Sequence, residues 1–327
     1  VARRSGFTCV FLNANLHPIT DSFSAVKFLK QQVDASLIDI RPLGALTKSF
    51  DGKHLAELYD MQMSGAIGFY DFKTPIQDAN VLKIALQYAK NFGGILFSYP
   101  QNSEIAGQSQ VNEDAFTTFI GMKGMPNLAE ELQIARDLSI LEYTGGQLHI
   151  PNVSTQNSIQ LIKQAKEKGL KVTCSVVLPH LIFTSEKLKH FESKYKILPP
   201  LRTQTDVDAL KDAVAQGVID MVTCDHEPIN KELKDLEFEN ASYGSIGLES
   251  AFAVTNSLFG AEKTAELFSK TKTHFGIKTS KIEVGQNADL SLFNPKSTFK
   301  LEDKHLHSTS KNSIFLDEEL KGKVLGS

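Results

Sequence analysis

Apolar residues along this chain alternate between short continuous runs and longer stretches of helical spacing. The short runs are rich in β-branched and aromatic residues, and each is followed by at least one helical stretch. This alternation is typical of repeated βα units. Strands are predicted at residues 7–12, 38–46, 66–71, 94–98, 147–153, 170–177 and 218–225. Helices are predicted near residues 21–33, 53–63, 78–91, 128–143, 156–168, 205–215, 248–258 and 261–275.

The predicted strands read as continuous apolar runs, for example Ile95-Leu96-Phe97, which suits a parallel sheet covered on both faces. An open doubly wound sheet would usually show a glycine cluster after an early strand, but the turn after residues 7–12 reads Asn13-Ala14-Asn15-Leu16-His17-Pro18. The sequence therefore favours an α/β fold, a (β/α)8 barrel over residues 1–280, with its first strand upstream of Val1.

The pattern changes at about residue 281. The segment from Ile282 to Pro295 reads as a turn followed by a short strand that the proline ends. We expect residues 281–327 to form part of a small β domain. Two polar stretches, residues 99–126 and 226–247, follow strand ends and are predicted to be the least structured parts of the chain.

Composition narrows the function classes. With 41% hydrophobic and 22% charged residues, the chain has the composition of a folded globular protein. Its 35 basic and 38 acidic side chains give a net charge of -3, which argues against nucleic acid as a partner. No uncharged apolar run approaches the roughly 18 residues that span a bilayer, and the start lacks a secretory signal. We expect no membrane association and a cytoplasmic location. Three scattered cysteines predict reduced, buried thiols: Cys9, Cys174 and Cys224.

Barrel enzymes carry their chemistry at the carboxyl ends of the strands. The residues at those ends here are Asn13, Asp71, Tyr99, Asn152, His180 and Asp225. A zinc hydrolase needs several imidazoles or carboxylates there, yet only two carboxylates are present. A phenol, with a pKa of about 10, and a neutral amide are poor replacements for histidine. The barrel thus has few metal ligands, and a structural role for Asp71, capping the following turn, is as good an interpretation as a functional one.

Two histidines near these strand ends need separate interpretations. His149 lies within a predicted strand, and the sequence leaves open whether it faces the barrel interior or the helices; we expect a core histidine rather than a ligand. His226 directly follows Asp225 and should point elsewhere, because successive strand residues alternate in direction.

Ten short segments occur in the order found in one known family. They are Gly44-Ala45-Leu46-Thr47-Lys48, Gln77-Asp78-Ala79, Gly121-Met122-Lys123-Gly124-Met125-Pro126, Ile134-Ala135-Arg136-Asp137, Leu148-His149-Ile150, Val153-Ser154-Thr155, Pro199-Pro200-Leu201-Arg202, Asp225-His226, Gly247-Leu248-Glu249 and Ala288-Asp289-Leu290. Through them the chain resembles dihydroorotases of the bacterial class that associates with aspartate transcarbamoylase, in the amidohydrolase superfamily. The resemblance implies a distorted barrel of the metallo-dependent hydrolase type, a small β domain built from both termini, and zinc-assisted interconversion of dihydroorotate and carbamoyl aspartate.

The resemblance also assigns metal positions. The family's first-strand HxHxR ligands would fall before Val1. The next ligand, an aspartate, matches Asp71, and the last, which is also the general base, matches Asp225. Where the family has two histidines, this chain has Tyr99 and Asn152. The resemblance therefore implies vestigial ligand positions, and we expect no metal or other cofactor.

The implied substrate positions are altered in the same way. Asn13 matches the first asparagine of the family's MPNTNP turn, although the surrounding turn is rewritten. Leu198 and Ile229 replace a polar asparagine and a histidine. Each unpaired polar group on a buried substrate would cost about 1 to 3 kcal/mol.

The resulting prediction is a dihydroorotase-like pseudoenzyme of pyrimidine biosynthesis that serves as a structural partner of aspartate transcarbamoylase, with Asp225 as a vestigial general base. The alternative is an active or re-purposed zinc amidohydrolase, with one metal on Asp71, Asp225 and the first-strand histidines. A self-contained homodimer is the alternative to the transcarbamoylase partnership.

Overall fold

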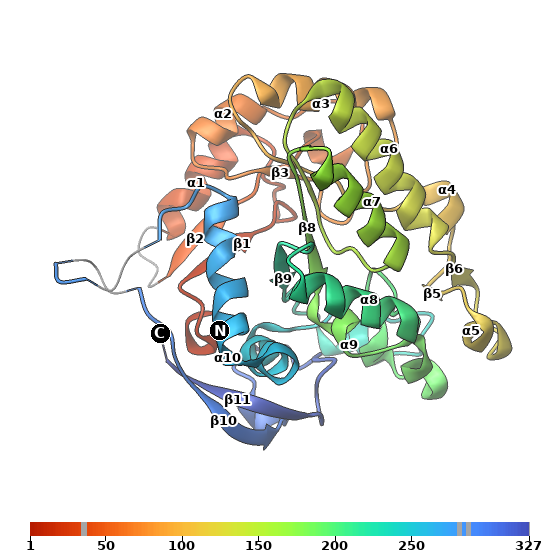
Figure 1. The fold of residues 1–327 in the computed structure, drawn as a ribbon. Helices are drawn as coiled ribbons and strands as arrows, with labels where there is room; N and C mark the ends of the chain where they lie inside the picture. Colours follow the sequence, from red (N-terminus) through yellow and green to blue (C-terminus); the bar gives the residue numbers. More distant parts are fainter. Residues whose placement is uncertain (34–37, 280–282, 286–288, 327) are drawn as a thin grey trace. The chain divides into compact units, whose positions relative to one another are not determined.

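A computed structural model describes residues 1–33, 38–279, 283–285 and 289–326 (Figure 1). The chain divides into two compact units. The sheet unit comprises Cys9–Gly107 and Pro126–Ser175, and the terminal unit comprises Val1–Thr8, Gln108–Met125 and Val176–Ser327.

The sheet unit is built on parallel strands that follow one another in sequence order. They are β1 (Cys9–Leu12), β2 (Asp39–Pro42), β3 (Phe69–Tyr70), β4 (Leu96–Phe97), β7 (Leu148–Ile150) and the first four residues of β8 (Val172–Val177). β1 pairs with β2, and β3, β4, β7 and β8 pair in that order, with Phe69 opposite Leu96 and Leu96 opposite Leu148. A bridge from Gly44 to Phe69 links the two sets. A Cβ at position 44 would lie 2.8 Å from the sulfur of Met61, so a larger residue there would require the Met61 side chain to move.

Helices connect these strands and bury one face each. They are α1 (Phe23–Val33), α2 (Leu58–Met63), α3 (Ala79–Lys90), α4 (Ser103–Ala106), α6 (Leu128–Thr144) and α7 (Gln156–Glu167), with a short 3-10 turn, η2 (Lys48–Phe50). In α3, Asp78 caps the first turn by accepting a hydrogen bond from the Asn80 amide at 2.8 Å. Leu82 and Leu86, one turn apart, are fully buried, and each such side chain contributes about 1.5 to 3 kcal/mol. The observed bounds of this helix agree with the predicted range of residues 78–91 within one residue at each end.

The terminal unit combines short strands with one long helix. Its strands are β5 (Val111–Asn112), β6 (Gly124–Met125), β9 (Met221–Thr223), β10 (Leu292–Lys300) and β11 (Glu319–Gly326), together with the end of β8. Its helices are α5 (Ala115–Phe119), α8 (Gln204–Ala215), α9 (Lys231–Lys234) and α10 (Leu248–His274). Its 3-10 helices are η1 (Arg3–Ser5), η3 (Leu178–Leu181), η4 (Ser185–His190), η5 (Ser193–Tyr195) and η6 (Asp303–His305).

Several sequence predictions are refined by these elements. The seven predicted strands are present but shorter than predicted. The two helices predicted over 248–275 form the single helix α10, interrupted at Gly260, whose positive φ of 79° breaks the helical geometry. The stretch 99–126, expected to be least structured, contains β5, β6, α4 and α5.

The expectation that Pro295 ends a short strand is wrong. β10 continues through Pro295 to Lys300 and pairs antiparallel with β11. The ladder register shifts between Asn294 and Thr298, so the proline lies where regular pairing is interrupted and its missing N–H breaks no regular ladder bond. The beginning of this segment, including Ile282, lies outside the described residues.

The β10–β11 pair packs on the first half of α10. Phe252 stacks on Phe293 with ring centroids 4.3 Å apart, and the Asn256 side-chain amide donates to the carbonyls of Pro295 and Lys321. The N-terminal segment also reaches this pair, where the Ser291 hydroxyl donates to the Gly6 carbonyl. The boundary predicted at residue 281 stays a prediction, since residues 280–282 and 286–288 are not described.

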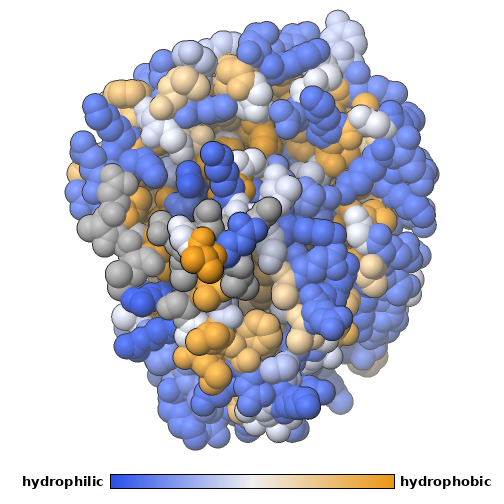
Figure 2. All heavy atoms as spheres, turned by 60° about the vertical axis from the view of Figure 1, so that its left-hand side comes forward, coloured by the Kyte–Doolittle hydropathy of each residue, from blue (hydrophilic) through white to orange (hydrophobic). Residues whose placement is uncertain are grey.

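Figure 2 shows one face of the molecule, on which hydrophilic side chains predominate and hydrophobic ones form small separate groups. Among the described helices, none has the length and apolar content needed to span a membrane.

Candidate functional site

Asp71 follows β3 and is almost completely buried. Its Oδ1 accepts hydrogen bonds from the amides of Leu46 at 2.7 Å and Thr47 at 2.9 Å, and its Oδ2 accepts one from the Thr47 hydroxyl. Burial raises the pKa of this carboxyl to about 6, against the opposing effect of these three hydrogen bonds. Both oxygens thus bind the chain segment that follows β2.

Glu130 on α6 makes the same arrangement with a different segment. Its Oε1 accepts from the amides of Ser154 at 2.8 Å and Thr155 at 3.1 Å, and its Oε2 accepts from the Ser154 hydroxyl. Sequence reasoning missed this residue, although Glu130 falls on the same helix face as the buried Gln133, Ile134 and Asp137. A charged residue on a helix face that is otherwise predicted to be buried was the signal that could have identified it. In both places a buried carboxylate satisfies two consecutive buried amides and a hydroxyl.

Tyr99 and Asn152 follow β4 and β7, the next two strands after β3 in the sheet order. Both are buried, with 2% and 5% of their surface exposed. Asn152 has a positive φ of 59°, a conformation that asparagine adopts more readily than most residues. Its backbone amide donates a hydrogen bond to the Ser175 hydroxyl at 3.3 Å. The sheet unit therefore brings Asp71, Tyr99 and Asn152 to the same edge of adjacent parallel strands, as predicted.

His149 is a core histidine, as expected. Its Nδ1 lies 2.9 Å from the Thr173 hydroxyl and its Nε2 lies 3.2 Å from the Ser175 hydroxyl, while its ring stacks on Phe97. Both ring nitrogens are engaged by side chains of the neighbouring strand β8.

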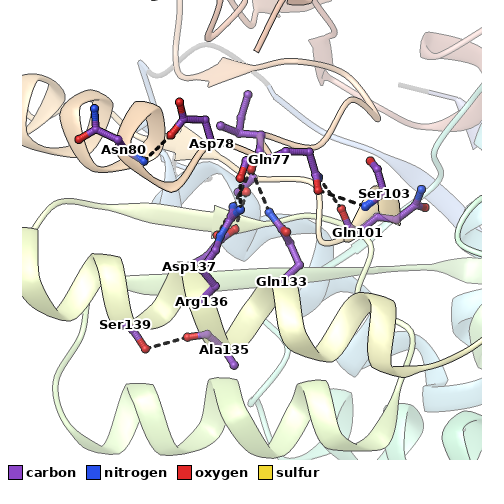
Figure 3. A network of polar contacts seen from close by, with 12 residues as sticks. Gln77, Asp78, Asn80, Gln101, Ser103, Gln133, Ala135, Arg136, Asp137 and Ser139 are labelled. Carbon is purple, nitrogen blue, oxygen red and sulfur yellow. Dashed lines mark hydrogen bonds and ion pairs between the residues drawn. The ribbon is translucent and has the colours of Figure 1, made fainter. Parts of the chain in front are cut away.

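A polar network holds the loops after β3 and β4 to α6 (Figure 3). Arg136 donates to the carbonyls of Ile76 and Gln77 and pairs with the neighbouring Asp137 at 2.7 Å. The Gln77 side chain in turn donates to the Gln101 carbonyl and accepts from the Ser103 amide. Asp137 on α6 also accepts a hydrogen bond at 2.6 Å from the hydroxyl of Ser98, which follows β4 and precedes Tyr99. The network therefore fixes the loops that carry Asp71 and Tyr99.

In the terminal unit, two other predicted strand-end residues line one small cavity. The cavity has room for about one water molecule. Its polar lining includes His180 and Asp225, and its apolar lining includes Leu198, which forms part of the wall. Asp225 adopts a positive φ of 43°, an uncommon conformation for a residue other than glycine.

His180 is fully buried and presents one unsatisfied nitrogen. Its Nε2 lies 3.1 Å from the Pro199 carbonyl and 3.2 Å from the Pro200 carbonyl, so Nε2 carries the proton and donates. Its Nδ1 is buried and has no hydrogen-bond partner within the described part of the chain. Burial, followed by the nearby positive charge of Arg202, lowers the pKa of His180 to about 4. The ring is neutral at pH 7, with a lone pair on Nδ1.

His226 and Ile229 have structural contacts. The His226 Nδ1 accepts from the amides of Gly247 at 3.2 Å and Leu248 at 3.3 Å, at the start of α10. The Ile229 amide donates to the Asn312 side chain at 3.2 Å. Asn13, the remaining predicted substrate residue, is half-buried directly after β1 in the sheet unit.

Comparisons with known proteins agree with the motifs. A family model described as dihydro-orotase-like matches residues 1–158. A dihydroorotase of Pelotomaculum thermopropionicum is 33% identical over 98% of this chain and 77% of that protein. A dihydroorotase of Leifsonia xyli subsp. xyli is 35% identical over 100% of this chain and 77% of that protein. This chain belongs to the dihydroorotase family.

Solved structures show the fold of this dihydroorotase-family chain. The L-hydantoinase (dihydropyrimidinase) of Arthrobacter aurescens matches with a TM-score of 0.85 and 22% identity, over 99% of this chain and 76% of that one. The dihydroorotase of Saccharomyces cerevisiae, in complex with 5-fluoroorotic acid, matches with a TM-score of 0.75 and 13% identity, over 99% of this chain and 91% of that one. The predicted α/β barrel of the amidohydrolase type is confirmed, with the antiparallel β10–β11 pair near the C-terminus.

At three expected dihydroorotase metal positions, Asp71, Tyr99 and Asn152, the donors present are poorly suited to zinc. In the sheet unit, Tyr99 and Asn152 offer a phenol and a neutral amide, and both oxygens of Asp71 already accept hydrogen bonds from the protein. Within each unit, the described residues contain no group of three His, Cys, Asp or Glu side chains that could hold a metal ion.

Proposed function

We propose that this dihydroorotase-family chain is a noncatalytic member that acts in the cytoplasm as a structural partner of aspartate transcarbamoylase in pyrimidine biosynthesis. The observation that carries the proposal is the environment of Asp71. A carboxylate at an expected metal position has both oxygens bound to the amides of Leu46 and Thr47 and the Thr47 hydroxyl. Its role there is to order the segment after β2.

The neighbouring positions support the same conclusion. Catalysis by this superfamily's route needs a metal to lower the pKa of water from about 15.7 toward about 7, so that a nucleophile exists at neutral pH. Tyr99 and Asn152 cannot replace the anionic or imidazole donors that such a metal requires. The apolar side chains of Leu198 and Ile229 stand where a polar substrate would need partners.

The framework around these altered positions is nevertheless intact. Family segments at Gln77-Asp78 and Arg136-Asp137 form the network of Figure 3, and Val153-Ser154-Thr155 is held by Glu130. Residues that shape the barrel are kept, while four of the expected metal and substrate positions are replaced, by Tyr99, Asn152, Leu198 and Ile229. A protein with this pattern of retention is suited to presenting a surface to a partner.

Steady-state assays test the absence of catalysis. We expect no turnover of dihydroorotate or carbamoyl aspartate, with or without added zinc, and zinc far below one ion per chain in protein never exposed to chelator. Turnover that disappears in Asp225→Ala, or near-stoichiometric zinc, would overturn the proposal.

The partnership is tested by native purification. We expect a complex with aspartate transcarbamoylase, identified by mass measurement, in extract from the native source. If the chain instead runs as a homodimer, while the transcarbamoylase is assembled and active without it, the scaffold role is wrong.

One observation favours the second candidate, an active or re-purposed zinc amidohydrolase. The unsatisfied Nδ1 of neutral His180 and the carboxylate of Asp225 belong to residues that line the same cavity, and both are good zinc donors. A zinc titration followed by calorimetry distinguishes the two candidates. Stoichiometric binding that is lost in both His180→Ala and Asp225→Ala would favour the amidohydrolase.

A further inference from the structure

Residues 230–244 form a loop of the terminal unit, here called the strap, which includes α9 (Figure 1). Asn312 holds the two ends of the strap together. Its Oδ1 accepts from the Ile229 amide at 3.2 Å, and its Nδ2 donates to the Glu227 carbonyl at 2.9 Å. The same Nδ2 lies 3.4 Å from the Gly244 carbonyl, which also accepts from it. A loop closed at its base in this way is an Ω-loop, a class of surface loop that is frequently functional.

The strap buries few apolar side chains. Between residues 231 and 243, the buried residues are Lys234, Phe238 and Ala241, and most of the others are exposed. One of the three buried residues is thus a lysine, a residue that is almost never fully buried unless it is paired. A segment with so few buried apolar contacts opens locally at low cost unless other interactions hold it.

Two buried ammonium groups supply such interactions. Lys196, which is 2% exposed, donates from Nζ to the carbonyls of Phe238 and Glu239, each at 2.8 Å. Lys234, which is 5% exposed, donates from Nζ to the carbonyls of Lys196 and Ser242, at 2.8 and 3.0 Å. One lysine therefore binds the strap from outside it, and the other binds outward from within it.

These contacts are stronger than the neutral ones around them. A hydrogen bond from a charged donor is roughly twice as strong as one between neutral groups. The Lys196 Nζ also lies 5.0 Å from the centroid of the Tyr243 ring and 5.4 Å from that of Phe238, within the range of cation–π attraction. The Gln110 side-chain amide adds a neutral hydrogen bond to the Glu239 carbonyl at 3.2 Å. The two lysines thus make the strongest of these attachments.

The strap shares its attachment with the cavity lined by His180. Residues 197–198, which follow Lys196, and residues 244–245, at the end of the strap, both line that cavity. The Gly244 amide donates at 3.1 Å to the Lys196 carbonyl, which also accepts from Lys234. The same bonds therefore hold the strap closed and hold two walls of the cavity together, and release of the strap would widen the cavity.

We propose that Lys196 and Lys234 form a latch that holds the strap closed, and that opening of the strap controls access from solvent to His180 and Asp225. With the latch made, the cavity has room for about one water molecule. With the latch released, the strap moves away on its base at Asn312 and the His180 ring becomes accessible. The strap acts in this way with or without the partner proposed above.

Hydrogen exchange followed by mass spectrometry of the full chain tests the latch. Lys196→Met and Lys234→Met each remove one ammonium group and keep a long side chain. In both variants, the amides of residues 231–244 should exchange at least about tenfold faster than in wild type. The matched control is Lys231→Met, on the same helix as Lys234 but with a side chain that is 84% exposed, which should stay within about twofold. The amides of α3, in the sheet unit, should keep wild-type protection throughout.

Acylation by diethyl pyrocarbonate, which attacks neutral imidazole, tests access to the cavity. His180 and His149 are each 1% exposed and lie in different units, so His149 is an internal control. His180 should be labelled at least about tenfold faster in Lys196→Met and Lys234→Met than in wild type, while labelling of His149 stays unchanged.

Each alternative outcome has a definite meaning. Strap exchange within about twofold of wild type in both lysine variants would overturn the latch. Faster strap exchange with unchanged labelling of His180 would overturn the control of access. Equal acceleration at His180 and His149, or loss of the wild-type circular dichroism, would show that the lysines are needed for the fold as a whole, and the latch would be wrong.

Discussion

Replacing Asp71 by alanine tests whether this carboxylate is structural or serves as a metal ligand. The substitution removes the acceptor for the amides of Leu46 and Thr47, whose residues have no exposed surface. Each buried amide left without a partner costs about 1 to 3 kcal/mol, so the two together predict a loss of about 2 to 6 kcal/mol in the free energy of unfolding. The Thr47 hydroxyl adds little, since it can rotate toward another acceptor.

Urea denaturation followed by circular dichroism measures this loss, because the chain has no tryptophan to serve as a fluorescent probe. The matched control is Asp78→Ala, which removes one exposed helix cap and should cost about 0.5 to 2 kcal/mol. We expect the Asp71→Ala loss to be the same with chelator and with added zinc. A loss below about 1 kcal/mol, or one that appears only with zinc present, would refute a structural role for this carboxylate.

Three further predictions concern other buried groups. Burial lowers the pKa of His180 from 6.5 to about 4 in the folded protein. Between pH 6.5 and about 4, the unfolded chain therefore binds one more proton than the folded chain. The free energy of unfolding should fall by about 3 kcal/mol as the pH drops through this window. His180→Gln should flatten that part of a denaturation series across pH. Glu130→Ala leaves two buried amides unpaired and should lower the free energy of unfolding by about 2 to 6 kcal/mol, whereas the neighbouring Glu131→Ala should change the urea midpoint little. The double variant Tyr99→His and Asn152→His restores two imidazoles, and calorimetry should detect tighter zinc binding than in wild type; an unchanged affinity would mean that more than ligands has been lost.

The sequence alone determined the positions of the main helices and strands and the family. Apolar spacing gave α3 and α6 within one residue at each end, because a helix that buries one face repeats its apolar positions every three or four residues. The segments quoted for the resemblance, such as Gly44-Ala45-Leu46-Thr47, were sufficient to indicate dihydroorotase, and the relatives confirm it over the whole chain. Local periodicity and short motifs are properties of neighbouring residues, so they are readable without coordinates.

Only the tertiary structure decided what the candidate site residues do. Asp71 binds amides 24 and 25 residues away, and Glu130 binds amides 24 and 25 residues away on another segment. From the sequence, Asp71 could be either a metal ligand or a structural group, and Glu130 was not identified as a candidate. Pro295 was misread for the same reason, since a proline is tolerated inside β10 only because pairing with β11 shifts register there. Hydrogen-bond partners of buried groups are set by which distant segments pack together, and a carboxylate's function follows from those partners rather than from its neighbours in the chain.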